Sequence, residues 1–358
     1  MRLLWVEIRD FRNHAETALE VPPGLIAVVG PNAQGKTNLL EAMYYLCALE
    51  SPRVRADLPL VRAGAEAAVL RGEAETGLGR VLVEVEVRGA GQNRVQVNRS
   101  PVRRKRDLRK QVRAVFAGPD DLAIVGGDPA ERRRFLDEAL RGLWPLKEGA
   151  GAAYDRALRQ RNRLLKDWDG SGEPPGLSAW DEELVTAGTQ LTLLREGAIE
   201  AVGPRAGAEF AALSGDPLIV EYESSVDRRE LPESFHRRLA ERRPDELVRR
   251  TTLVGPHRDD LRLVVQDLVA RGFASHGESW AAALCLRLGL AAAVAEEAGE
   301  EPIRFLDDPF SGLDPERRDR IARRLVGPEQ RVIAVPDDQH VPPGAAVWRV
   351  KEGRVVAE

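Results

Sequence analysis

The chain contains 358 residues, of which 43% are hydrophobic and 31% charged, and its formal net charge is −4. A membrane span needs about 20 consecutive apolar residues. The sequence has no run approaching that length, so these figures predict a globular protein in water and exclude a membrane partner. The length suffices for two domains, or for one large α/β domain with an insertion.

The N-terminal segment and the cysteines predict a cytoplasmic protein. Residues 1–7 place an acidic side chain inside a short apolar stretch and show no small-residue cleavage signal, unlike a secretory peptide. Cys47 and Cys285 lie far apart within apolar helical patterns and form no C-x-x-C pair. We therefore expect two buried thiols.

In chain order, the first hundred residues are predicted to form mostly strands around one helix. β-Branched or alternating apolar residues predict strands at 3–8, 25–29, 80–88 and 94–97. Apolar residues at three- and four-residue spacing then predict helices at 129–140, 152–167 and 179–201. Strand patterns return at 218–222, 261–265, 304–306 and 332–335.

A glycine-rich loop follows the predicted strand 25–29 and precedes the amphipathic segment 38–46. This order of strand, G-x-x-x-x-G-K-[ST] loop and helix predicts a site for a nucleoside triphosphate. Backbone N–H groups and the helix dipole would bind the phosphates, Lys36 would reach the β- and γ-phosphates, and Thr37 would bind Mg²⁺. The nucleotide contacts predicted here are Gly30, Pro31, Asn32, Ala33, Gln34, Gly35, Lys36, Thr37 and Asn38.

A second apolar strand ends in two aspartates. Such a strand commonly supplies the carboxylate that holds Mg²⁺ and the group that activates water. We expect Asp307 to bind the metal and Asp308 to orient or deprotonate water, with Lys36 completing the catalytic set.

Two further turns have the character of nucleotide contacts. Ser275 and Gly277 begin a long apolar helical run, where a hydroxyl, N–H groups and a helix dipole would meet an anion. Asp314 lies in a turn just after the aspartate pair. Taken alone, Ser275 is an ordinary helix cap; with the aspartate strand about thirty residues later, the segment resembles the signature segment of ABC-type ATPases.

These elements together predict an α/β fold of the P-loop NTPase class, an ABC/SMC-type ATPase head with an inserted helical lobe. No heptad run is long enough for a long coiled coil. We expect three parts: an ATPase lobe with the phosphate loop and flanking sheet at 1–118, an inserted helical arm lobe at 119–212, and a returning α/β part with the remaining motifs at 213–358.

The motifs resemble, from end to end, the RecF family of recombination mediators in the SMC-like branch of the ABC ATPases. The blocks that carry the resemblance are 10–13, 30–42, 126–137, Tyr154 with 158–162, and 252–261. The last two blocks separate this family from other SMC relatives. The resemblance adds Arg12 to the nucleotide contacts.

The resemblance also implies how the site would work. The phosphate loop of one subunit would face Ser275, Gly277 and Asp314 of a second copy, so that ATP and Mg²⁺ close a homodimer on DNA and hydrolysis opens it. Members of this family bind double-stranded DNA near single-strand junctions and, with RecR and RecO, help to load RecA onto gapped DNA. The resemblance therefore implies a weak DNA-dependent ATPase activity that serves as a conformational switch.

Three positions depart from the family pattern. Glu278 places a negative charge beside the expected phosphate contact of Ser275, which should weaken it unless the side chain points away. After the strand at 331–335, where relatives have a γ-phosphate sensor, the chain reads Pro336-Asp337-Asp338, with His340 nearby. Asp308 is one methylene shorter than the Glu of most ABC proteins, so we expect slow turnover.

The basic residues are concentrated in one part of the chain. Residues 101–170 contain 17 Lys and Arg against 11 Asp and Glu, whereas the remainder is strongly acidic. The densest cluster is Arg103, Arg104, Lys105, Arg106, Arg109 and Lys110. Such a cluster suits duplex phosphates, because no aromatic residues alternate with it for base stacking, but a solvated helix surface or charged hairpin explains the same pattern.

Two other function classes remain. An ATPase head that regulates a nucleic-acid-processing nuclease would need a separate metal-dependent catalytic domain, and the sequence offers no spare carboxylate cluster for one. A transporter nucleotide-binding subunit would need a transmembrane partner chain.

Overall fold

A computed structural model describes residues 1–170 and 172–358. Its central sheet has the strand order β15-β14-β3-β13-β12-β8, and all of its strands except the antiparallel edge strand β15 run parallel. The bounds are β3 Leu25–Val29, β8 Ala114–Ala117, β12 Ile303–Asp307, β13 Arg331–Val335, β14 Ala346–Lys351 and β15 Arg354–Ala357. Because the strands are parallel, the loops that follow β3 and β12 meet at one edge of the sheet.

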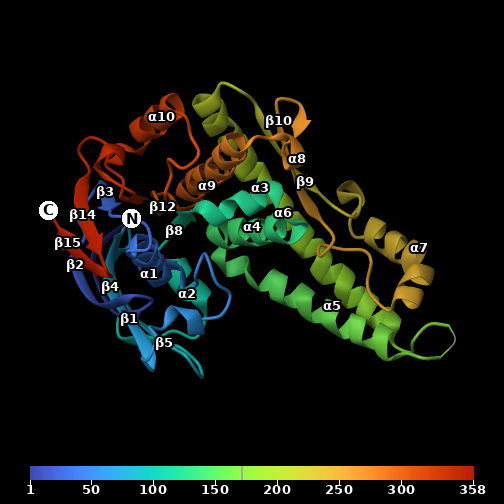
Figure 1. Cartoon of the computed structure of the whole chain (residues 1–358). Coiled ribbons are helices and arrows are strands. Elements are labelled where there is room, and N and C mark those ends of the chain that lie inside the picture. The colour runs from blue at the N-terminus through green and yellow to red at the C-terminus, as the bar shows by residue number, and fades with distance from the viewer. Residues whose placement is uncertain (171) are drawn as a thin grey trace.

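A second, antiparallel sheet lies beside the first, on the left of the molecule in Figure 1. Its strand order is β2-β1-β4-β5-β6-β7, with β1 Arg2–Phe11, β2 His14–Glu20, β4 Ala67–Thr76, β5 Gly79–Arg88, β6 Arg94–Val97 and β7 Ser100–Pro101. Helix α1, Lys36–Ala48, packs between the two sheets, and nearly all of its side chains are buried. The helix that follows the phosphate loop is therefore anchored in a core.

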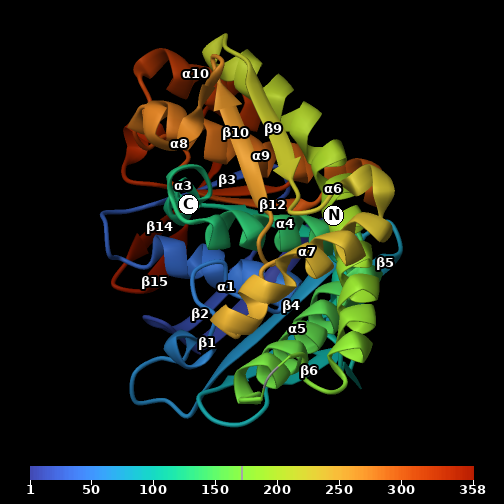
Figure 2. The ribbon, with the colours of Figure 1, turned by 90° about the vertical axis from the view of Figure 1, so that its right-hand side faces the viewer.

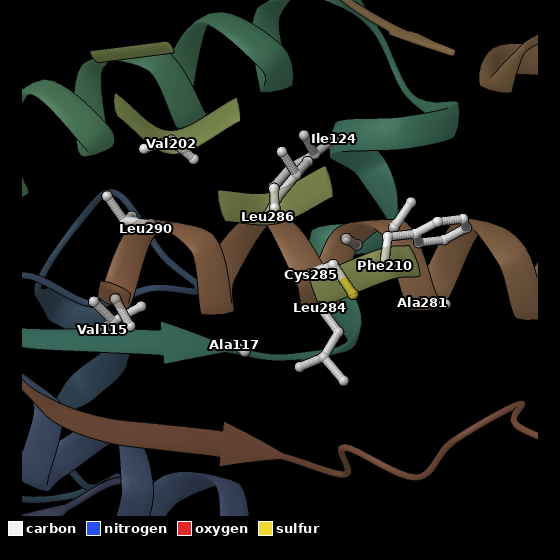
Figure 3. Close-up of a cluster of buried hydrophobic side chains, with 14 of the residues drawn as sticks. Val115, Ala117, Ile124, Val202, Phe210, Ala281, Leu284, Cys285, Leu286 and Leu290 are labelled. Atoms are coloured by element: carbon white, nitrogen blue, oxygen red, sulfur yellow. The ribbon is translucent and has the colours of Figure 1, made fainter. Parts of the chain in front are cut away.

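Helices cover the opposite face of the central sheet. They are α3 (Leu122–Gly126), α4 (Pro129–Leu143), α6 (Leu177–Ser214) and α9 (His276–Ala298). Figure 3 shows Leu284 and Leu290 on α9 among Val115 of β8 and Val202 of α6. Among the described residues, α9 is long and apolar enough to cross a membrane, but 72% of its most apolar window is buried, as in a core helix.

The arm extends away from the two large sheets (Figure 1), and its helices α5 and α7 lie in front of the sheets in Figure 2. It is built from α5 (Gly149–Asp167), the outer part of α6, and α7 (Glu233–Arg249), with a small core that includes Tyr154, Leu184 and Phe235. Arg161 is fully buried at this end and pairs with Asp181 at 2.7 Å and Glu246 at 2.6 Å. A sheet of β9 (Leu218–Glu223), β10 (Asp260–Val265) and β11 (Leu268–Val269) flanks it.

The remaining helices are short: α2 Lys105–Arg109, α8 Ala270–Phe273 and α10 Pro315–Leu325. The predicted fold class is confirmed, with the P-loop architecture and a helical arm. The predicted strands at 25–29 and 94–97 agree residue for residue with β3 and β6, and the helix expected at 179–201 continues as α6 to Ser214. The domain boundaries at 118/119 and 212/213 stay a proposal, since helices α4 and α6 share a core with the central sheet.

Candidate nucleotide-binding site

A polar cavity of about 490 Å³ opens at the carboxyl ends of β3 and β12. It contains most of the predicted phosphate loop together with both aspartates of the second strand. Its lining residues are Asn13, Asn32, Ala33, Gly35, Lys36, Thr37, Asn38, Arg53, Pro119, Asp307, Asp308, Ala334, Val335 and Pro336. The structure therefore brings together residues separated by about 270 positions in the sequence.

Tight backbone contacts hold the loop in place. A Cβ atom on Gly30 would lie 2.4 Å from the carbonyl oxygen of Val350, and Gly35 has φ +115°, so both positions need glycine. On the outer side, the Asn13 amide donates to the Gln34 carbonyl oxygen at 3.0 Å, and the Gly353 N–H donates to the same oxygen at 2.9 Å. The loop is thus braced before any ligand arrives.

Lys36 turns its amine into the loop. Its Nζ donates to the carbonyl oxygens of Gly30 at 2.5 Å and Pro31 at 3.0 Å. Burial lowers the pKa of this amine, and the nearby carboxylates of Asp307 and Asp308 partly oppose that shift. A buried cation held by neutral carbonyl groups can exchange those contacts for phosphate oxygens.

Thr37 and Asp307 meet at the point where a metal would bind. The Thr37 hydroxyl donates to Asp307 Oδ2 at 2.8 Å. Burial raises the pKa of Asp307 above its usual range, and the Thr37 hydrogen bond acts in the opposite direction. A hydroxyl and a carboxylate in contact are oxygen donors of the kind that Mg²⁺ takes, so these two residues fit the predicted metal site.

Asp308 follows directly, with φ +49°, and lines the same cavity. Burial raises the pKa of its carboxyl group, while Lys36 and His340 favour the charged form. His340 itself is held by Asp337, whose Oδ1 lies 2.7 Å from Nδ1. A carboxylate with a raised pKa near the reacting phosphate is a candidate proton acceptor.

The two arginines near the loop have different surroundings. Arg12 lies outside the cavity lining, because its Nε and Nη2 donate to both carboxylate oxygens of the buried Glu41 at 2.9 Å and its Nη1 donates to the Pro59 carbonyl at 2.9 Å. Arg53 lines the cavity and donates to Asn38 Oδ1 at 3.0 Å, and it also makes one longer contact with Glu41 Oε2, at 3.3 Å. The predicted contact from Arg12 remains a prediction, and Arg53 is a residue that sequence reasoning missed.

The signature segment lies outside this cavity. Ser275 is exposed and caps α9: its Oγ accepts from the Glu278 N–H at 3.3 Å, while its own N–H donates to Glu278 Oε2 at 2.8 Å. These hydrogen bonds hold the pKa of Glu278 below its usual range. The carboxylate thus folds back onto the helix end, in a capping box.

Gly277 and Asp314 lie beside this segment. A Cβ atom on Gly277 would come 3.0 Å from the carbonyl oxygen of Gly312, and Asp314 caps α10 by accepting from the Arg317 N–H at 2.9 Å. Asp314 is exposed, like Ser275. Within the described chain, these three residues form a surface separate from the phosphate loop.

The basic cluster is only partly available to a ligand. Arg103, Arg104, Lys105 and Lys110 are exposed. Arg109 is buried and pairs with Glu50 at 2.8 Å and Glu148 at 2.9 Å, so its place in a solvent-facing cluster was wrong. The guanidinium instead ties α2 to the start of α5.

Comparison with known proteins places the chain in a family. A family model described as an AAA domain matches residues 6–124. "DNA replication and repair protein RecF" from Streptomyces avermitilis is 42% identical, over 99% of this chain and 99% of its own length. The chain belongs to the RecF family. The RecF protein of Cutibacterium acnes is 39% identical over 94% of this chain and 93% of its own length.

Solved structures agree with that assignment. A structure described as "the recombination mediator protein RecF-ATP in RecFOR pathway" has a TM-score of 0.90 and 27% identity, covering 99% of this chain and 97% of its own. An SMC head bound to the C-terminal winged-helix domain of ScpA has a TM-score of 0.58 at 15% identity, covering 100% and 98%. The second likeness concerns the fold alone: the chain has the fold of an SMC head.

Proposed function

We propose that this RecF-family chain is an ATP-gated DNA-binding protein that acts as a recombination mediator. The observation that carries the proposal is the cavity in which Lys36, Thr37 and Asp307 meet at one edge of the central sheet. The relatives described as RecF, and the one described with ATP, support reading this cavity as the ATP site.

Each residue of the cavity has a chemical role in this proposal. The N–H groups of Gly30 to Asn38 and the Lys36 amine would bind the phosphates. Thr37 and Asp307 would hold Mg²⁺, and a bound Mg²⁺ would neutralise part of the phosphate charge. Asp308 would orient or deprotonate the attacking water, supported by the raised pKa of its carboxyl group.

We propose further that the site is completed by a second copy of the chain. Ser275, Gly277 and Asp314 are the remaining nucleotide contacts that the resemblance implies, yet none of them lines the cavity in this chain. An exposed helix N-terminus offers N–H groups and a favourable dipole to the γ-phosphate of a partner. ATP then stabilises the closed dimer, and hydrolysis removes that stabilisation.

The biological role follows from the relatives as a proposal. A mediator in a pathway with RecO and RecR would bind duplex DNA near single-strand gaps, contact RecR, and help to load RecA. Exposed Arg103, Arg104 and Lys105 would contribute phosphate contacts. The hydrolysis is proposed to be slow and stimulated by DNA, so that it resets the protein in the cytoplasm.

Sedimentation with and without ATP, followed by duplex binding on the same samples, tests this function. We expect ATP to convert wild-type monomers to dimers and to raise duplex affinity, and Lys36→Met to abolish both effects because the phosphates lose their cation. If ATP changes neither mass nor DNA affinity in the wild type, the gated-dimer proposal is wrong.

A further inference from the structure

Helix α5 carries a row of basic residues along its exposed side. Arg156, Arg159, Arg163 and Lys166 are spaced by three, four and three residues, which places them on one face of an α-helix. All four are exposed, and at 1.5 Å rise per residue the row is about 15 Å long. The buried positions Tyr154, Ala157, Arg161 and Leu165 lie on the opposite side, against the arm core.

This row differs from the other arginine-rich surfaces of the arm in how its charges are partnered. In the part of the chain that the structure describes, Arg156, Arg159 and Lys166 form no ion pair, and Arg163 has only the exposed Asp167 at 3.5 Å. On α7, by contrast, Arg237, Arg238 and Arg242 are paired with Glu230, Glu241 and Asp245 at 2.8 to 3.2 Å. The α5 row therefore retains a positive field that α7 largely cancels.

The basic segment at 103–110 lies near the start of helix α5. Helix α2 lies at the foot of α5, where Arg109 pairs with Glu148 at 2.9 Å (Figure 1). A cavity of about 470 Å³ lies between them, lined by Lys105 on one side and by Tyr154 and Asp155 on the other. Arg55, also exposed and without an ion pair in the described chain, lines the same cavity. From α5 only Tyr154, on the buried side of the helix, and Asp155 line this cavity, so the α5 row itself lies outside it.

A row of exposed cations along one helix, three of the four without an ion pair in the described chain, suits a regular polyanion. Duplex DNA carries one negative charge per about 1.7 Å of axis, so a 15 Å row meets several phosphates. The α5 row contains no aromatic side chain between its charges, which favours backbone contact over base stacking. An acidic protein surface is the competing ligand, but it would need carboxylates at matching spacing.

We propose that α5 is a duplex-binding rail, with Arg156, Arg159, Arg163 and Lys166 contacting phosphates of the DNA that Arg103, Arg104 and Lys105 also contact. This rests on the proposed DNA-binding function and adds the arm to the DNA site. The arm then sets the direction of the duplex across the protein.

The test compares two triple neutralisations with equal charge change. Arg156→Gln, Arg159→Gln and Lys166→Gln remove the unpaired row, and Arg237→Gln, Arg238→Gln and Arg242→Gln remove paired charges on α7. Binding of a 30-base-pair duplex is measured by anisotropy with ATP and Mg²⁺ across a salt series, and the melting temperature checks folding. Removing one phosphate contact lowers affinity roughly eightfold at 0.1 M salt and flattens the log–log salt slope by about 0.9.

We expect the α5 variant to show the weaker affinity and the flatter slope that follow from removing two to three phosphate contacts, and the α7 variant to keep wild-type values. An α5 variant with wild-type affinity and slope, or an equal loss of affinity in both variants, contradicts the proposal that the α5 row contacts duplex DNA. Neither result contradicts the proposed DNA-binding function. Absence of duplex binding by the wild type instead contradicts the proposed function. If the triple variant melts early, the single Arg159→Gln variant gives the same test with the effect of one phosphate contact.

Discussion

The phosphate-loop side and the signature side of this protein are built in opposite ways. The loop is braced by Asn13 and Gly353, and Lys36 and Asp307 are buried in the cavity that it forms. Ser275 and Asp314 are exposed and cap their own helices, and Asp314 also pairs with Arg317 at 3.6 Å. The phosphate-loop side, or buried side, keeps charged groups out of water within a single chain. The signature side, or exposed side, presents polar groups to the solvent.

This difference indicates how a switch can be divided between two copies of a chain. Desolvated charges are costly, and they are tolerated where a ligand will use them. A capped helix end is stable in water, so the signature side can stay exposed in a monomer without destabilising the fold. Substitutions on each side can test whether the two sides differ in this way.

The largest effect is expected on the buried side, from Asp307→Asn. Loss of a charged ligand should weaken MgATP binding by about 1.5–3 kcal/mol, or roughly 10- to 150-fold, as measured by calorimetry. The melting temperature should not fall. Because the folded-state pKa of Asp307 is raised, its ionisation destabilises the fold as pH rises above the unfolded value of 3.8, and the amide removes that penalty. Asp319→Asn, on the exposed face of α10, is the matched control.

A smaller effect is expected on the exposed side, from Ser275→Arg. The variant should weaken ATP-dependent dimerisation by tenfold or more, about 1.4 kcal/mol, in sedimentation equilibrium. The affinity of the monomer for MgATP should stay at its wild-type value, since Ser275 does not line the cavity. Ser275→Thr preserves the capping hydroxyl and should dimerise normally. Weaker nucleotide binding by the monomer would contradict the separation of the two sides.

Arg53→Gln tests whether Arg53 belongs to the nucleotide site on the phosphate-loop side. A guanidinium in the cavity is expected to contribute about 1 kcal/mol to phosphate binding in a water-filled site, so ATP affinity should fall roughly fivefold. Arg12→Gln should instead lower the melting temperature, because the buried Glu41 loses its bidentate partner. Equal losses of ATP affinity in both variants would place Arg12 in the nucleotide site too.

The smallest effect is expected from Glu278→Gln. Glutamine can keep the capping box while removing the negative charge near a partner's phosphate. Exposed charge pairs are worth about 0.2–1 kcal/mol, so ATP-dependent dimerisation should tighten by a factor of about two to three at low salt. The gain should disappear in high salt because the interaction is screened. An unchanged dimer constant at low salt would mean that the carboxylate, folded onto Ser275, does not face the phosphate.

Much of the loop and its strand could be predicted from the sequence because their causes are local. Apolar runs specify β3 and the helix after the loop, and the positive φ of Gly35 belongs to the turn itself, whereas the close approach that requires Gly30 comes from the distant Val350. The strands β4 and β14 were missed: the buried positions of β4 include the small residues Gly72 and Ala74, which give a weak apolar signal, and the positions of both strands depend on partners far along the chain. For the same reason the bracing by Asn13 and Gly353 had no signal of its own.

The sequence alone determined the chemistry of this protein: a phosphate loop, an aspartate pair and a capped signature helix, each recognisable from neighbouring residues. Only the tertiary structure decided which side chains share a cavity. It placed Arg53 beside the loop and turned Arg12 to Glu41, and it buried Arg109 while leaving three of the four α5 cations without an ion pair among the described residues. The physical reason is that ion pairing and burial depend on distances across the fold, which residue type and spacing do not specify.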